Sequence, residues 1–303
     1  YILIIPSALV FFLGDAVGSR RHAWTVWAVM LALFIGGVLW IYFSELHGTH
    51  LLQQIAGGAV PNMEGKEVRF GVFGTSLFAT ATTDASCGAV NAMHDSFTPI
   101  GGMVPIVLMA LGEVVFGGVG CGLYGMLGFV ILTVFIAGLM VGRTPEYLGK
   151  KIGPKEMRMA VILCITTPLL ILVGAGIMSL DPATANSLNN PGVHGFSEVL
   201  YAATSAGGNN GSAFAGFNGN TPLINLALGF EMLANRFIPI AAVCVLAGSL
   251  AVRPKVATSA GTLSTSNALF VFLLVLMVLL IGALTMFPAL ALGPVAEQLM
   301  MVL

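Results

Sequence analysis

Long apolar runs alternate with short polar stretches along this chain. Five of the runs reach about 20 residues, the length of helix that crosses a hydrocarbon core of about 30 Å. These expected spans are 23–43, part of 100–141, 159–180, 223–252 and 267–290. Residues 1–13 are also apolar, and we expect them to be the end of a preceding spanning helix, with the N-terminal part of the protein missing from this sequence. The pattern predicts an all-α polytopic membrane protein.

Two further apolar segments, 70–81 and 196–206, are too short to cross a membrane. Each leads into a polar, glycine-bearing stretch, 82–95 in the first case and 207–220 in the second. Non-helical backbone is tolerated at membrane depth only where it lines a water-filled cavity or is buried in protein. We therefore expect both segments to enter the membrane and return to the same side, as re-entrant pore loops.

These two segments are related by an internal repeat. Identical residues recur 123 positions apart, at Phe73 and Phe196, Leu77 and Leu200, Gly88 and Gly211, Thr98 and Thr221, and Pro99 and Pro222. The repeated unit is span, re-entrant loop, span, and both copies have the same orientation. We expect one unit over 23–141, a second over 158–252, and a final transmembrane helix over 267–290.

The two loops, residues 82–89 and 205–212, are rich in glycine and in small hydroxyl and amide residues. Glycine permits backbone conformations that turn successive carbonyls toward one axis. Carbonyl oxygens arranged in this way can replace the hydration shell of a potassium ion. The loops are therefore candidates for parts of a cation filter. The alternative is that they are ordinary external loops packed against the helices.

Two ionisable residues inside the apolar runs occupy equivalent positions. Glu113 and Arg236 are 123 positions apart, so in a pore with pseudo-symmetric walls they would face the same lumen at the same depth. Charges within a membrane are costly and mark functional sites. We interpret Glu113 as a residue that attracts cations below the filter and Arg236 as one that prevents free leakage. The alternative is an ion pair with a purely structural role.

The run 100–141 is about twice the length that one crossing needs. Residues 112–125 are also too rich in glycine for a regular helix, since each glycine costs about 1 kcal/mol relative to alanine. A helix broken at mid-membrane satisfies both observations. A loop at the break would be a candidate gate containing Gly117, Gly118 and Gly120. Small-residue packing between helices is the alternative.

Composition supports the membrane assignment and excludes other classes. Hydrophobic residues make up 57% of the chain and charged residues only 8%, against about 25% charged residues in soluble domains. The net charge of −1 provides no basic surface for nucleic acid. The four cysteines lack the spacing of a metal site, and we expect small buried thiols. Neither a Walker A loop nor a DKTGT phosphorylation motif is present, so any ATP chemistry belongs to another chain.

Basic residues predict the orientation. Nine of the 12 lysines and arginines lie in three loops, which the positive-inside rule places in the cytoplasm. Two crossings separate consecutive loops if the two short segments re-enter from the outer side, and the C-terminus then ends outside. The clustered residues are Arg20, Arg21, Arg143, Lys150, Lys151, Lys155, Arg158, Arg253 and Lys255.

Distinctive motifs extend along the whole chain, at residues 62–67, 86–90, 93–97, 112–126, 142–151, 191–200 and 209–216. Over essentially all 303 residues the chain resembles the KdpA family, the potassium-translocating subunits of bacterial Kdp P-type ATPases, within the superfamily of potassium transporters. The resemblance implies a pore of four span–loop–span repeats, of which this chain carries the third and fourth.

The same resemblance implies roles for particular residues. The implied third filter strand is Ser86, Cys87 and Gly88, and the implied fourth is Asn209, Asn210 and Gly211. Glu113 and Arg236 match charges below the filter, and Arg143 matches a basic residue at the cytoplasmic end. Five positions depart from the family pattern. Asp84, Gly207 and Gly208 could tune the affinity for potassium, and Glu231 and Asn235 surround Arg236.

The resemblance also implies the setting in which the chain works. Potassium would be the transported ion, with no organic cofactor. The chain would be a non-catalytic subunit, and a P-type partner subunit would hydrolyse ATP with Mg²⁺. The expected partners are that catalytic subunit, small accessory membrane subunits and the lipid of the bacterial cytoplasmic (inner) membrane, but no nucleic acid.

Other classes of protein remain open at this point. A stand-alone potassium channel or symporter of the Trk, Ktr or HKT kind shares the span–loop–span plan. A secondary transporter with broken helices would be favoured by inverted repeats, whereas these repeats are parallel. An intramembrane enzyme would be built on His94 and Asp95, which we interpret instead as a hydrogen-bonded anchor at the filter edge.

Overall fold

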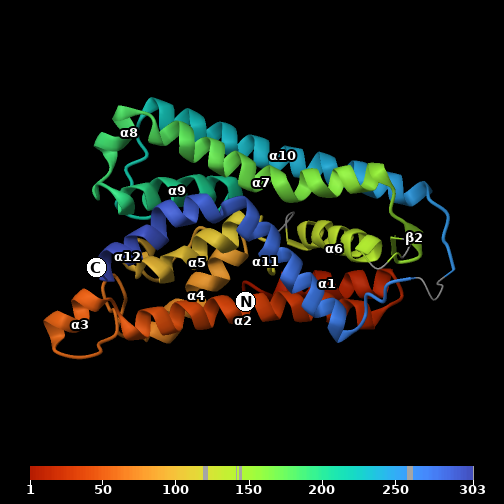
Figure 1. The fold of residues 1–303 in the computed structure, drawn as a ribbon, viewed down its shortest axis with the longest axis horizontal. Coiled ribbons are helices and arrows are strands. Elements are labelled where there is room, and N and C mark those ends of the chain that lie inside the picture. The colour runs from red at the N-terminus through yellow and green to blue at the C-terminus, as the bar shows by residue number, and fades with distance from the viewer. Residues whose placement is uncertain (119–121, 141, 143–144, 258–261, 303) are drawn as a thin grey trace.

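Helices lying along one long axis dominate the computed structural model, which describes residues 1–118, 122–140, 142, 145–257 and 262–302 (Figure 1). The α-helices are α1 Ile4–Ala16, α2 Arg20–His47, α3 His50–Ala56, α4 Gly71–Asp84, α5 Pro99–Ala110, α6 Gly122–Met140, α7 Pro154–Ser179, α8 Pro182–Ser187, α9 Val193–Gly208, α10 Pro222–Val252, α11 Ala268–Leu290 and α12 Ala296–Val302. A 3₁₀ turn, His94–Ser96, precedes α5, and a π-helical turn, Ala291–Val295, joins α11 to α12.

Five helical segments in the described part of the chain are long and apolar enough to cross a membrane. They are Arg20–Ala56, Gly122–Met140, Pro154–Ser179, Pro222–Val252 and Ala268–Met301. Each expected span overlaps one of them, so the prediction of an all-α, multi-pass membrane protein is confirmed at this level. The helices extend beyond the apolar cores because capping residues continue them into polar sequence, as Ser19 does at the start of α2.

The three basic loops lie at the same end of the molecule. Lys150 donates to the carbonyls of Leu250 (2.7 Å) and Arg253 (2.8 Å), and His22 Nε2 lies 2.7 Å from the Tyr147 hydroxyl. Figure 1 shows this end opposite the one that holds α3, α8 and the C-terminus. The loops that the charge pattern assigned to one side of the membrane are therefore together in the fold.

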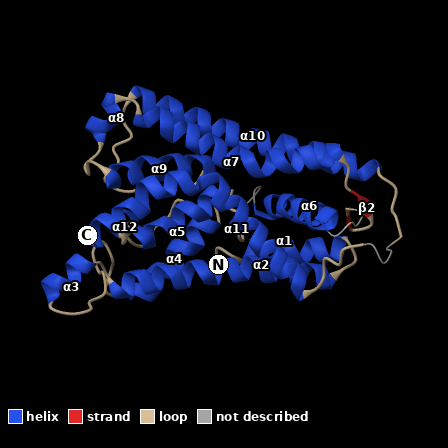
Figure 2. Cartoon of the chain, viewed as in Figure 1, coloured by secondary structure: helices blue, strands red, loops and turns tan. Residues whose placement is uncertain are grey.

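A two-stranded antiparallel ribbon departs from the all-helical expectation (Figure 2). Its strands are β1 Glu146–Tyr147 and β2 Lys150–Lys151, joined by Leu148 and Gly149, which both have positive φ. Such a short hairpin has no alternating apolar pattern that a sequence argument could detect. Buried contacts of Tyr147 and the Lys150 bonds described above hold it against the helix ends.

The two segments related by sequence have similar local structure. Helices α4 and α9 occupy equivalent positions, and each is followed by an irregular segment that leads to the start of a longer apolar helix. Those helices begin with the same cap: Thr98 Oγ1 accepts from the Gly101 amide (3.2 Å), and Thr221 Oγ1 accepts from the Ile224 amide (3.3 Å). Proline follows the cap in both cases, at a position where its missing N–H costs nothing.

The two copies then differ. Helix α5 ends at Ala110 and the next helix begins at Gly122, whereas α10 continues unbroken through the equivalent positions. The predicted interruption of the run 100–141 is therefore present. Two apolar clusters flank it: one joins α2, α6 and α11, and the other joins α5, α7 and α9.

A buried ion pair fixes the first repeat around α4. The Glu45 and Lys66 side chains are fully buried, with Lys66 Nζ 2.8 Å from Glu45 Oε2. Asn62 Nδ2 donates to the same oxygen (2.8 Å), while the amide and hydroxyl of Thr98 both donate to Oε1 (2.7 Å each). One carboxylate thus joins the end of α2, the segment before α4 and the start of α5.

Removing the cation from this network should destabilise the fold. We expect Lys66→Met to lower the free energy of unfolding by about 3–5 kcal/mol, because the Glu45 carboxylate then stays buried without its counter-charge. Denaturant titration of the purified protein in mixed micelles measures the change, with the exposed Lys155→Met as the matched control. Equal stability of the two variants would show that the pair contributes nothing.

Candidate functional site

Helices α4 and α9 end in the same backbone turn. Ser86 and Asn209, 123 positions apart, both have a positive φ, of 56° and 60°, which few residues other than glycine adopt. In each turn the next residue's amide donates to the carbonyl five residues earlier. The Cys87 amide donates to the Thr82 carbonyl (3.1 Å), and the Asn210 amide donates to the Ser205 carbonyl (2.9 Å). Two independent segments therefore reverse direction in the same way, directly after a short helix.

The two turns contact each other. The Ser86 hydroxyl donates to the Gly208 carbonyl at 2.8 Å. A side chain at Gly88 would overlap the carbonyl oxygen of Asn210, so the backbones meet where only glycine fits. Gly211, the equivalent of Gly88, has open space around it but a φ of 83°, which also favours glycine. All six residues predicted for the two filter strands thus lie in or beside one contact between equivalent turns.

Hydroxyl groups support the turns from behind. Thr82 Oγ1 lies 2.7 Å from the Cys87 carbonyl oxygen and 2.6 Å from that of Ala89, so its single proton is shared between them. In the second turn, Ser212 Oγ lies 3.0 Å from the Tyr201 hydroxyl. The Thr82 bonds hold backbone carbonyls of the first turn, whereas the Tyr201–Ser212 bond joins two side chains beside the second.

His94 joins this support to the first repeat. Its Nδ1 lies 2.8 Å from the Tyr201 hydroxyl, which also contacts Ser212. Burial, together with the positive charge of Lys66, lowers the His94 pKa to about 4, so the ring is neutral at pH 7. A neutral imidazole and a phenol can form this bond without placing a charge behind the turns.

The interrupted segment between α5 and α6 lies against the first turn. Within it, Glu113 and Phe116 have positive φ values of 53° and 49°. A side chain at Gly118 would overlap the Ala85 carbonyl oxygen, and one at Gly117 would overlap the Glu113 carbonyl oxygen. Two of the three predicted gate glycines, Gly117 and Gly118, are therefore required by close backbone contacts. Two other predicted residues, Gly120 and Arg143, lie outside the described residues.

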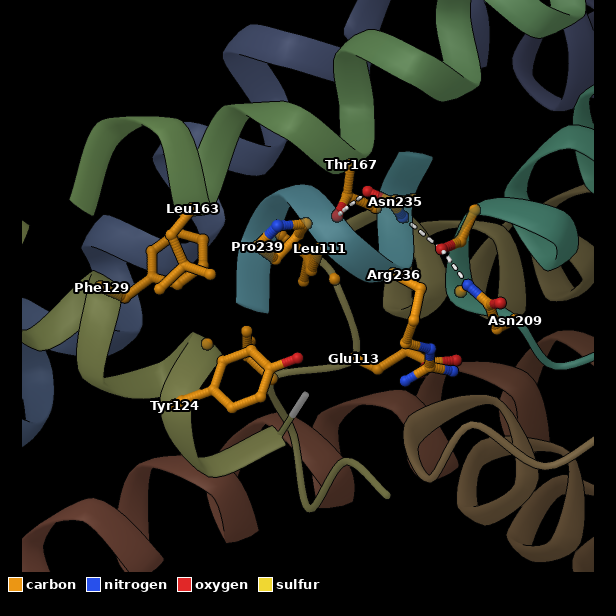
Figure 3. A pocket seen from close by; sticks show the side chains of 15 residues that line it. Leu111, Glu113, Tyr124, Phe129, Leu163, Thr167, Asn209, Asn235, Arg236 and Pro239 are labelled. Carbon is orange, nitrogen blue, oxygen red and sulfur yellow. Dashed lines mark hydrogen bonds between the residues drawn. The ribbon is translucent and has the colours of Figure 1, made fainter. Parts of the chain in front are cut away.

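A cavity of about 40 Å³, room for a few water molecules, lies beside this segment and the end of α9 (Figure 3). Glu113 and Arg236, which lie 123 positions apart, both line it. Asn235, another lining residue, accepts from the Thr167 hydroxyl (3.1 Å) and donates to the Gly207 carbonyl. The cavity wall therefore contains one acid, one base and two asparagine amides, of which Asn235 is held by these bonds.

A charged network connects α9 with the C-terminal helix α12, and no motif in the sequence indicated it. His194 Nδ1 lies 2.7 Å from Glu297 Oε1, and its Nε2 lies 3.0 Å from Asp95 Oδ1. The other Asp95 oxygen accepts from the Gly216 amide at 3.0 Å. Hydrogen bonds to Asp95 and then Glu297 raise the His194 pKa to about 10, so the ring is an imidazolium cation.

Asp95, His194 and Glu198 also have ligand atoms within 4.8 Å of one another, a spacing that could hold a metal ion. A metal needs an unprotonated ring nitrogen, whereas both nitrogens of His194 face carboxylate oxygens. The arrangement is therefore an ion-pair network. His94 and Asp95 bond to different partners, which fits the predicted anchor and provides no catalytic pair.

Comparison with known proteins identifies the family. The family model KdpA, described as "Potassium-transporting ATPase A subunit", matches residues 1–299. This chain belongs to the KdpA family. The resemblance inferred from the sequence motifs is thereby confirmed.

Curated members of the KdpA family are similar over nearly all of this chain. A protein from Desulfovibrio desulfuricans is 58% identical over 311 residues, covering 99% of this chain and 53% of that protein. Proteins from Clostridium botulinum and Ralstonia pickettii are each 57% identical, covering 98% of this chain and 52% and 51% of their own lengths. All three are named "Potassium-transporting ATPase potassium-binding subunit". The chain spans about half the length of these relatives.

The His194 network predicts a pH-dependent stability for this KdpA-family chain. The folded-state pKa of about 10 exceeds the ordinary value of 6.5, so the network stabilises the fold fully below pH 6.5 and less as the pH rises toward 10. Thermal midpoints of the wild type and His194→Gln should therefore differ most near pH 6 and converge by about pH 10. The exposed His50→Gln is the control. A difference that does not change with pH would contradict the assignment.

Proposed function

We propose that this chain contributes two filter strands to the potassium-binding subunit of an ATP-driven potassium uptake complex. The observation that carries the proposal is the contact between the equivalent turns at Ser86–Gly88 and Asn209–Gly211. The names of its relatives support potassium as the ion, since each is a potassium-binding subunit of a potassium-transporting ATPase.

In the proposed filter, backbone carbonyls of both turns replace part of the hydration shell of K⁺. Helices α4 and α9 have 14 and 16 residues, too few to cross a bilayer alone, which supports a re-entrant path for each segment. Two further repeats would complete the ring in the whole subunit. Potassium is the cargo, and the proposal involves no organic cofactor.

Below the filter, the interrupted segment is the proposed gate. Gly117 and Gly118 bring its backbone against the first turn, and Gly120 belongs to the same proposed loop. Glu113 would attract K⁺ into the cavity, while Arg236 in the same wall would raise the barrier to free cation leakage.

From the cavity, we propose that the ion passes sideways to a P-type subunit, which hydrolyses ATP with Mg²⁺. Small accessory membrane subunits would complete the assembly. The complex would lie in the bacterial cytoplasmic membrane, with the three basic loops inside and the C-terminus outside. Arg143, in the second basic loop, would lie at the cytoplasmic end.

ATP hydrolysis by the assembled complex, titrated separately with K⁺ and Na⁺, tests this proposal. The complex should contain a full-length subunit that carries this sequence. We expect K⁺-selective stimulation, and we expect Gly88→Asp to reduce the preference for K⁺ over Na⁺ at least tenfold. The reason is that a side chain at Gly88 displaces the Asn210 carbonyl.

Gly58→Asp is the matched control, because its surroundings are open and exposed. Unchanged selectivity in Gly88→Asp would remove the filter assignment. Potassium currents through the chain without any partner would instead favour a stand-alone channel or symporter of the Trk, Ktr or HKT kind.

Arg236 should control coupling. We expect Arg236→Ala to increase K⁺ flux that is not accompanied by ATP hydrolysis, because the cavity loses its positive charge. Rubidium uptake into proteoliposomes, with and without ATP, measures this ratio. The exposed Arg69→Ala should behave as the wild type does. Wild-type coupling in Arg236→Ala would limit this residue to a structural role.

A further inference from the structure

Asp84 is the last residue of α4, two positions before the turn at Ser86. Its side chain is fully buried, and neither carboxylate oxygen has a hydrogen-bond partner among the described residues. The negative end of the α4 dipole lies at the same place and disfavours an anion there. A structural role in packing does not account for a carboxylate here.

The second repeat has glycine at the equivalent position, Gly207, but it obtains a carboxylate from elsewhere. Glu231 on α10 is 2% exposed, and neither of its carboxylate oxygens has a partner among the described residues. A Cβ atom added to Gly207 would lie 3.2 Å from Glu231 Oε1. A Cβ atom added to Gly174 would lie 2.5 Å from Glu231 Oε2. The Glu231 carboxylate therefore fills the space that a side chain at 207 would occupy.

Each repeat thus has one acidic residue at one of two equivalent positions, and the position that is acidic differs between the repeats. The first has Asp84 at the end of its short helix and Leu108 in the following helix, whereas the second has Gly207 and Glu231 at those positions. Either combination brings one buried carboxyl group to the end of the short helix, just before the turn.

Burying an unpaired carboxylate costs several kcal/mol unless a positive charge or a proton compensates it. Both carboxyl groups lie directly behind turns that are proposed to bind a dehydrated cation. A nearby carboxylate attracts a cation strongly where water is excluded, because the effective dielectric constant is low.

We propose that Asp84 and Glu231 are equivalent determinants of cation affinity, one in each repeat. Their negative charges attract a dehydrated monovalent cation in the filter, and neither carboxylate contacts the cation. This inference rests on the proposed function, because it needs a cation between the turns. It assigns a role to two residues that lie outside the filter strands and the cavity.

The first test is the K⁺ concentration that half-saturates ATP hydrolysis by the assembled complex. We expect Asp84→Asn and Glu231→Gln each to raise it about tenfold while the maximal rate is retained, since these changes remove charge and keep shape. The exposed Glu64→Gln is the control. Half-saturation equal to that of the wild type in both variants would overturn the inference.

A double substitution that gives the first repeat the residues of the second tests whether the two carboxyl groups are equivalent. Asp84→Gly should lower the affinity for K⁺, and adding Leu108→Glu should restore it, because the first repeat then carries the arrangement of the second. Loss of affinity without restoration, in a complex that assembles normally, would contradict the equivalence of the two carboxyl groups. If Leu108→Glu prevents assembly, the two isosteric variants decide the question alone.

The outcome also distinguishes this inference from the proposed function. A wild-type complex that shows no K⁺ stimulation at all would reject the function. A wild-type complex that is stimulated by K⁺, with isosteric variants that respond identically, would reject only the role of Asp84 and Glu231.

Discussion

The contact between Gly88 and the Asn210 carbonyl is the constraint on which the rest of the site depends. It brings two backbone turns from different repeats so close together that no side chain fits at position 88. Each turn can reach this position only because a short helix, α4 or α9, ends just before it and reverses the chain at a residue with positive φ. In the first turn, the Thr82 hydroxyl then holds the carbonyls of Cys87 and Ala89.

Around this contact the two repeats share a plan and differ in detail. Both short helices end in the same turn, and both following helices begin with a threonine cap. Only the first of those helices is interrupted, and its irregular segment lies against the Ala85 carbonyl. This asymmetry gives the cavity different walls, with Glu113 from the irregular segment and Arg236 from the continuous helix α10.

Sequence periodicity and length predicted the spans, because a hydrocarbon core demands long apolar helices. The repeat predicted which loops are equivalent, and glycine content predicted the break before α6. The ion pair of Glu45 with Lys66 and the network of His194 with Glu297 could not be predicted, since each joins residues that only the tertiary fold brings together. The ribbon at 146–151 was missed because its strands have two residues each. The roles of Glu113, Arg236 and the filter strands stay predictions.

Anomalous scattering from Tl⁺, a heavy substitute for K⁺, tests the central claim most directly in a crystal of the assembled complex. The account predicts an ion between the backbone carbonyls of residues 86–88 and 209–211, displaced when K⁺ is added. Tl⁺ bound elsewhere in the complex, with none between these two turns, would contradict it.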